Sequence, residues 1–72
     1  MYYNYHAILR KLINSGDLAR CEIVSTYHGV SPAMVFYFYS HSPVFVREYR
    51  FQEYIELLND MGIDIENNLD TK

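Results

Sequence analysis

Few residues of this chain fall into the patterns that carry catalysis or bind metals. The candidates are one cysteine, Cys21, and two histidines further along, His28 and His41. The histidines are expected at opposite ends of one strand, roughly 25 Å apart at ~3.3 Å per residue, too far to share a metal ion. Cys21 lies in an alternating pattern that turns it into the core, where a thiol is inert. With no Gly-rich phosphate loop or paired-carboxylate pocket either, we expect no metal, no cofactor and no enzyme.

Aromatic residues are the more informative feature. Eighteen residues, 34–51, contain four Phe, three Tyr and three Val. Two short helices are not expected to hide so much ring surface, and tyrosine suits interfaces because it combines a large apolar ring with a polar tip. We therefore predict that rings on the outer face of a sheet contact a protein partner. The alternative is that cross-strand aromatic pairs only stabilise a hairpin. The predicted interface residues are Tyr37, Tyr39, Phe45 and Tyr49.

Charge is distributed unevenly along the chain. Residues 1–50 carry five basic and three acidic side chains (+2), whereas residues 51–72 carry one basic and six acidic (−5), which gives the net charge of −3. Glu53, Glu56 and Asp60 fall at i, i+3 and i+7, on one face of a helix. We predict that this acidic stripe docks on a basic surface of a partner. A solvated helix face is the alternative.

Hydrophobic periodicity predicts the elements that would position these residues. Apolar residues at helical spacing indicate a first helix over 3–15, capped by Asn4 and ended by Gly16, and a second helix that starts at Phe51 and ends at Gly62. Ile63 is expected to close a Schellman-type contact behind Gly62. Alternating and β-branched residues between the helices indicate three strands, over 19–27, 33–40 and 44–49.

The order α-β-β-β-α predicts an α+β fold, a three-stranded antiparallel meander with both helices packed on one face. Residues 1–63 form the single compact domain, and the polar residues 64–72 are expected to be a disordered tail. Alternation divides the strand residues between the two faces. Cys21, Ile23, Met34, Phe36 and Phe38 are predicted to face the helices, and Val24, Tyr37 and Tyr39 to face outward.

Size and composition narrow the functional classes. A 72-residue domain with one cysteine cannot form an internal disulfide, so a second copy is a natural source of added stability. The N-terminus does not read as a secretory signal and no apolar run approaches ~20 residues, so we expect a cytoplasmic protein outside the membrane. We predict a small non-catalytic protein-binding module that forms a homodimer. It would also suit an inhibitor or modulator on a basic site of a larger protein, as in phage or mobile-element accessory proteins.

Nucleic-acid binding is the alternative function. The order α-β-β-β-α resembles that of double-stranded-RNA-binding domains, whose second helix opens with phosphate-gripping lysines. Here the matching segment, Arg50-Phe51-Gln52-Glu53-Tyr54, offers one arginine followed by an acid, which would repel a duplex. A three-stranded sheet on a helix also resembles integrase arm-type DNA-binding domains, and only Arg20 and Arg47 could serve as the basic residues of such a sheet.

Overall fold

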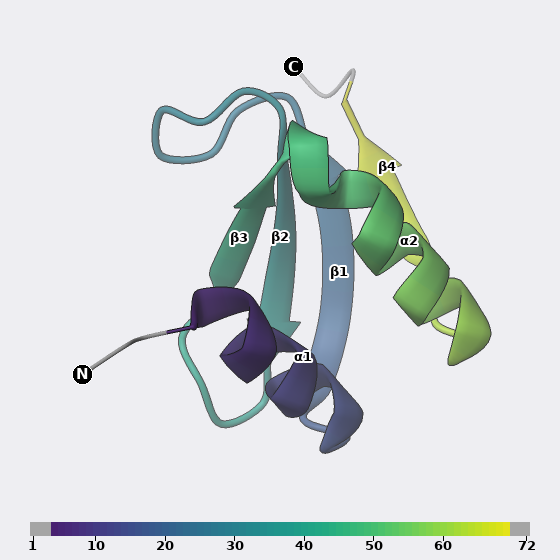
Figure 1. Cartoon of the computed structure of the whole chain (residues 1–72). Coiled ribbons are helices and arrows are strands. Elements are labelled where there is room, and N and C mark those ends of the chain that lie inside the picture. The colour runs from purple at the N-terminus through teal and green to yellow at the C-terminus, as the bar shows by residue number, and fades with distance from the viewer. Residues whose placement is uncertain (1–3, 70–72) are drawn as a thin grey trace.

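A computed structural model describes residues 4–69 and shows two helices against one sheet (Figure 1). The first two strands are connected by residues 25–32, and a short 3-10 turn joins the third strand to the second helix. The elements are α1 (Tyr5–Asn14), β1 (Leu18–Val24), β2 (Ala33–Phe38), β3 (Val44–Arg47), η1 (Glu48–Arg50), α2 (Phe51–Asp60) and β4 (Ile65–Asn68).

The sheet has four strands in the order β3-β2-β1-β4. The pairs β1/β2 and β2/β3 are antiparallel, as the predicted meander requires, but β4 pairs with β1 in parallel. The α+β class is therefore confirmed, whereas the prediction of three antiparallel strands is wrong because α2 leads into a fourth strand and makes the sheet mixed. The resemblance in element order to double-stranded-RNA-binding domains ends at α2 for the same reason.

The segment after α2 departs most from the prediction. Residues 64–72 were expected to be a disordered tail, yet Ile65–Asn68 form β4, and Ile65 packs against the core. A Schellman turn starts this return. Gly62, at φ +74°, donates its N–H to the Asn59 carbonyl at 3.0 Å, and Ile63 donates to the Leu58 carbonyl at 2.9 Å. Residues 70–72 lie outside the described residues.

The start of the chain follows the capping rules. Asn4 accepts a hydrogen bond from the Ala7 backbone N–H on its Oδ1 at 3.0 Å, and α1 begins at the next residue, Tyr5. Gly16 takes φ +85° behind the helix, a conformation that L side chains disfavour. The predicted helix over 3–15 is thus confirmed in the described part, and its first residue, Tyr3, lies outside it.

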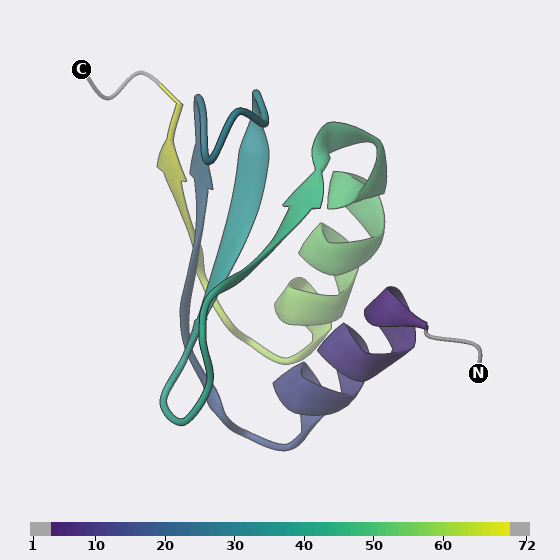
Figure 2. The ribbon, with the colours of Figure 1, turned by 90° about the vertical axis from the view of Figure 1, so that its left-hand side faces the viewer.

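Both helices pack on the same face of the sheet, as Figure 2 shows. The strand residues that were predicted to face inward all belong to this core, which confirms the assignment of the inner face. Burial raises the pKa of the Cys21 thiol to about 12, so the thiolate is not available at neutral pH. The buried residues of the core are Leu9, Ile13, Cys21, Met34, Phe36, Phe38, Val46, Tyr54 and Leu58.

The outer face of the sheet carries a second, smaller apolar cluster. Val35 and Ala33 of β2 are buried there together with Val30, which belongs to the β1–β2 connection. The tyrosine of the same connection, Tyr27, packs on this cluster, and its ring lies 5.7 Å from that of Phe45. The connection therefore covers outer-face surface that the sequence analysis left for a partner. Between residues 4 and 69, neither helix is long and apolar enough to cross a membrane.

Candidate binding groove between α1 and β3

The four aromatic residues of the predicted interface do not form one surface. Tyr37 and Phe45 lie on the outer sheet face, where they pack on the second cluster. Tyr39 follows the end of β2, with 77% of its surface exposed. Tyr49 is 79% exposed. It was predicted to lie in the third strand, but that strand ends at Arg47 and Tyr49 belongs to η1. Because β2 and β3 are antiparallel, Tyr39 and Tyr49 lie near opposite ends of the sheet.

Tyr37 is held in place by a charged network, which we name the outer-face cluster (Arg20, Glu22, Tyr37, Glu66 and Asn68). Its hydroxyl donates to Glu22 Oε2 at 2.6 Å, and the Arg20 guanidinium lies 4.2 Å from its ring centroid. Asn68 donates to Glu22 Oε1 at 2.7 Å, and Arg20 pairs with Glu66 at 3.1 Å and with Glu22 at 3.5 Å. These contacts join β2, β1 and β4 across the sheet.

The pKa values in the outer-face cluster follow from these contacts. The hydrogen bond from Tyr37 holds the pKa of the Glu22 carboxyl below its usual value, against an opposing effect of burial, and the bonds from Asn68 and Arg20 add to the lowering. The same Tyr37–Glu22 bond, together with burial, raises the pKa of Tyr37 to about 12. At neutral pH the tyrosine is therefore a donor and the glutamate a charged acceptor.

The predicted acidic stripe lies on α2, which covers the inner face of the sheet, so it is not continuous with Tyr37 and Phe45. Glu53 is not a free charge, because Arg10 and Arg50 each approach it to 3.0 Å. Glu56 accepts a hydrogen bond from Gln52 at 3.0 Å, and Asp60 is exposed. The charge of Glu53, the first residue of the stripe, is therefore balanced within the chain by Arg10 and Arg50.

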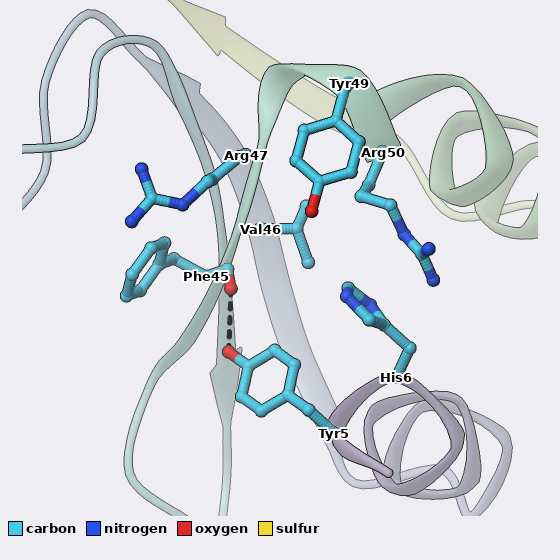
Figure 3. A pocket seen from close by; sticks show the side chains of 7 residues that line it. All are labelled: Tyr5, His6, Phe45, Val46, Arg47, Tyr49 and Arg50. Carbon is cyan, nitrogen blue, oxygen red and sulfur yellow. Dashed lines mark hydrogen bonds between the residues drawn. The ribbon is translucent and has the colours of Figure 1, made fainter.

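A groove that the sequence analysis did not identify lies between α1 and β3. Tyr5 divides it, and its hydroxyl donates to the Phe45 carbonyl at 2.7 Å (Figure 3). On one side is a hollow of about 260 Å³, the cationic hollow, lined by Tyr5 and His6 of α1, Phe45–Arg47 of β3, and Tyr49 and Arg50 of η1. On the other side is an apolar hollow of about 60 Å³, lined by Tyr5, Ile8, Leu9, Leu12, His41 and Val44.

The cationic hollow contains arginine and histidine side chains but no carboxylate. Its name comes from Arg47 and Arg50, two of the six Lys and Arg residues of an acidic chain. His6 lies between α1 and α2, with Nδ1 2.8 Å from the Tyr54 hydroxyl. Burial, with a smaller effect of Arg50, lowers the pKa of His6, so its imidazole is mainly neutral at pH 7.

The histidines and the acidic residues are distributed over separate parts of the structure. Across residues 4–69, no three His, Cys, Asp or Glu side chains gather closely enough to hold a metal ion. His28 and His41 contact different aromatic rings, those of Tyr27 and Phe38. Comparisons with protein-family models, curated proteins and solved structures find no match to this chain.

Proposed function

We propose that this chain is a small, non-catalytic protein-binding module that holds a segment of its partner in the α1–β3 groove. One observation carries the proposal: two adjoining hollows coincide with exposed apolar side chains. Within residues 4–69, six large apolar or aromatic side chains are exposed, and three of them, Tyr5, Ile8 and Tyr49, line the groove. Concentration of such side chains around a hollow is typical of interaction sites.

The sizes of the hollows favour a protein partner over a small molecule. Pockets for whole drug-sized ligands measure ~300–1,000 Å³. The cationic hollow, at about 260 Å³, and the apolar hollow, at about 60 Å³, are each smaller than this range. Each has the size of a single side chain or end group. A peptide segment would supply two such groups on one backbone.

The groove is better suited to this role than the surfaces that the sequence singled out. On the outer sheet face, Tyr37 and Arg20 already have partners within the outer-face cluster. The nucleic-acid alternative relied on Arg20 and Arg47, and Arg20 is paired with both Glu22 and Glu66. A lone Arg47 offers too few phosphate contacts for that class of binding, which depends on several.

Two equally exposed tyrosines provide the test. A random-peptide library displayed on phage is selected against the wild-type chain, and the affinity of the recovered peptides is measured by calorimetry. Tyr49→Ser should weaken binding by roughly 5- to 30-fold, the effect of one central interface residue. Tyr39→Ser should leave the affinity unchanged, because Tyr39 does not line the groove although it is as exposed as Tyr49.

The opposite results would reject the groove. Peptides that lose affinity with Tyr39→Ser but not with Tyr49→Ser would place binding at the other end of the sheet. The predicted homodimer is one form of the same proposal, with a second copy as partner. Light scattering over a concentration series distinguishes a homodimer from a complex with another protein. A dimer held by the groove should dissociate in the Tyr49→Ser variant.

A further inference from the structure

We propose that the cationic hollow is an oxyanion subsite, which accepts the carboxylate or phosphate of an acidic side chain in the bound segment. That the anion belongs to a peptide rests on the proposed function. The subsite itself rests on the charges, donors and rings that line the hollow.

Charge balance is the first argument. Arg47 makes no ion pair with any residue of the described part of the chain. Arg50 has a carboxylate neighbour in Glu53, but Arg10 shares it, so two guanidinium groups have one carboxylate between them. The nearest further acid in sequence, Glu48, is exposed and does not line the hollow. An excess of positive charge therefore remains at this place in a chain of net charge −3.

One hydrogen-bond donor without a partner is the second argument. Arg50 Nη2 donates to Glu53 Oε2 at 3.3 Å, whereas its Nε, 3.0 Å from Glu53 Oε1, remains a buried donor without a hydrogen bond. Figure 3 shows the guanidinium of Arg50 beside the His6 ring and that of Arg47 across the hollow, on the side of Phe45. Guanidinium donors bind carboxylate and phosphate groups in strong, charge-assisted hydrogen bonds.

The tyrosine rings are the third argument. Tyr5 and Tyr49 approach the hollow from α1 and η1, and the apolar side chain of Val46 lies between them in Figure 3. A group that carries both an oxyanion and a flat or short apolar stem would contact these rings while its charge meets Arg50 on the His6 side or Arg47 on the Phe45 side. Phenyl phosphate and phenylacetate reproduce this combination with the two oxyanions, and phenol provides the same ring without a full charge.

The test is an amide chemical-shift titration of the ¹⁵N-labelled chain with each of the three compounds. Phenyl phosphate or phenylacetate should shift residues 5–6 and 45–50 saturably, with a Kd in the millimolar range, about what ligands of ten heavy atoms achieve. Arg47→Gln should weaken this binding ~5-fold, and Arg47→Gln with Arg50→Gln more than ~10-fold. Lys11→Gln removes the same charge from α1 outside the hollow and should change the Kd less than twofold.

Each outcome decides between the alternatives. Saturable binding of only one oxyanion supports the subsite and identifies its chemistry as phosphate or carboxylate. Absence of saturable shifts, equal binding of phenol, or equal weakening by Lys11→Gln overturns it. Peptides that bind in the groove with full affinity to the Arg47→Gln variant overturn the subsite but leave the proposed function standing. If phenyl phosphate binds the hollow but no peptide binds the groove, the oxyanion subsite stands and the proposed function is overturned.

Discussion

The outer-face cluster and the cationic hollow are built from the same residue types, arginine beside tyrosine, but differ in their carboxylates. In the outer-face cluster, Arg20 lies over the Tyr37 ring and pairs with Glu22 and Glu66. In the cationic hollow, no carboxylate lines the wall. An arginine beside a tyrosine becomes an internal cross-link between strands where neighbouring carboxylates pair with both residues. Where no acid lines the hollow, and the neighbouring Glu53 is shared by two arginines, the same pair is left to attract an external anion.

The two regions also differ in what they hold together. The outer-face cluster connects three strands, with Glu22 of β1 accepting from Tyr37 of β2 and from Asn68 of β4. The contacts beside the groove join α1 to its neighbours through exposed groups, chiefly the Tyr5–Phe45 hydrogen bond and the Arg10–Glu53 ion pair. We therefore expect substitutions in the cluster to change stability, and substitutions in the hollow to change binding.

The largest effect is expected from removal of β4. A chain that ends at Ile63 loses Ile65 from the core, and Glu66 and Asn68 from the outer-face cluster. A single core of this size supplies only ~3–5 kcal/mol, so the shortened chain should be largely unfolded by circular dichroism and amide-shift dispersion. A chain that ends at Leu69 keeps every described residue and should retain the native spectrum. If the Ile63 chain folds equally well, residues 64–69 contribute no stability.

A smaller effect is expected from matched Glu→Gln substitutions in the two regions. Glu22→Gln removes the charged acceptor of two hydrogen bonds at a side chain only 12% exposed, and should cost about 2 kcal/mol of unfolding free energy. Glu53→Gln alters ion pairs whose side chains are 29–45% exposed, and should cost less than ~1 kcal/mol. Urea denaturation measures both. Equal losses would remove the distinction between the regions.

The smallest effect is a pH dependence that belongs to Glu22. Its pKa is lower in the folded chain than its ordinary value of 4.5, so the folded state binds fewer protons than the unfolded state just below that pH. The stabilisation is complete above about pH 4.5 and is lost as the pH falls through the folded-state pKa. The difference in unfolding free energy between wild type and Glu22→Gln should therefore shrink as the pH is lowered from 6 toward ~3. If this difference in unfolding free energy did not change with pH, the charge of Glu22 would not contribute to stability.

Sequence patterns predicted the fold wherever the local signal was strong. Each helix ends two residues before a glycine at positive φ, and the faces of β1 and β2 follow alternation, as Cys21 and Phe36 illustrate. The fourth strand was missed because Ile65–Asn68 is four residues long and contains one apolar side chain, too short a pattern to stand out from a polar tail. Its place beside β1 is decided by the turn at Gly62 and by Ile65 in the core.

The candidate site was less predictable, since it depends on contacts between distant segments. Tyr5 and Phe45 are separated by 40 residues, and the groove exists only because α1 lies beside the edge of β3. Tyr49 was predicted as an interface residue of the third strand; it is exposed, but β3 ends at Arg47 and Tyr49 belongs to η1. The available signal was Tyr5 itself, a residue of the apolar stripe of α1 whose polar tip requires a partner.

The hydroxyl of Tyr5 has a consequence for assembly. β3 is a boundary strand of the sheet, and the Phe45 carbonyl of this strand accepts a hydrogen bond from that hydroxyl. An incoming strand would have to displace the tyrosine before it could pair there. The opposite boundary, β4, is the one at which a neighbour can add without that displacement. Because strand addition is opposed at one of its two boundaries, the sheet is better suited to pairing with a second copy than to growth into a fibre by repeated strand addition.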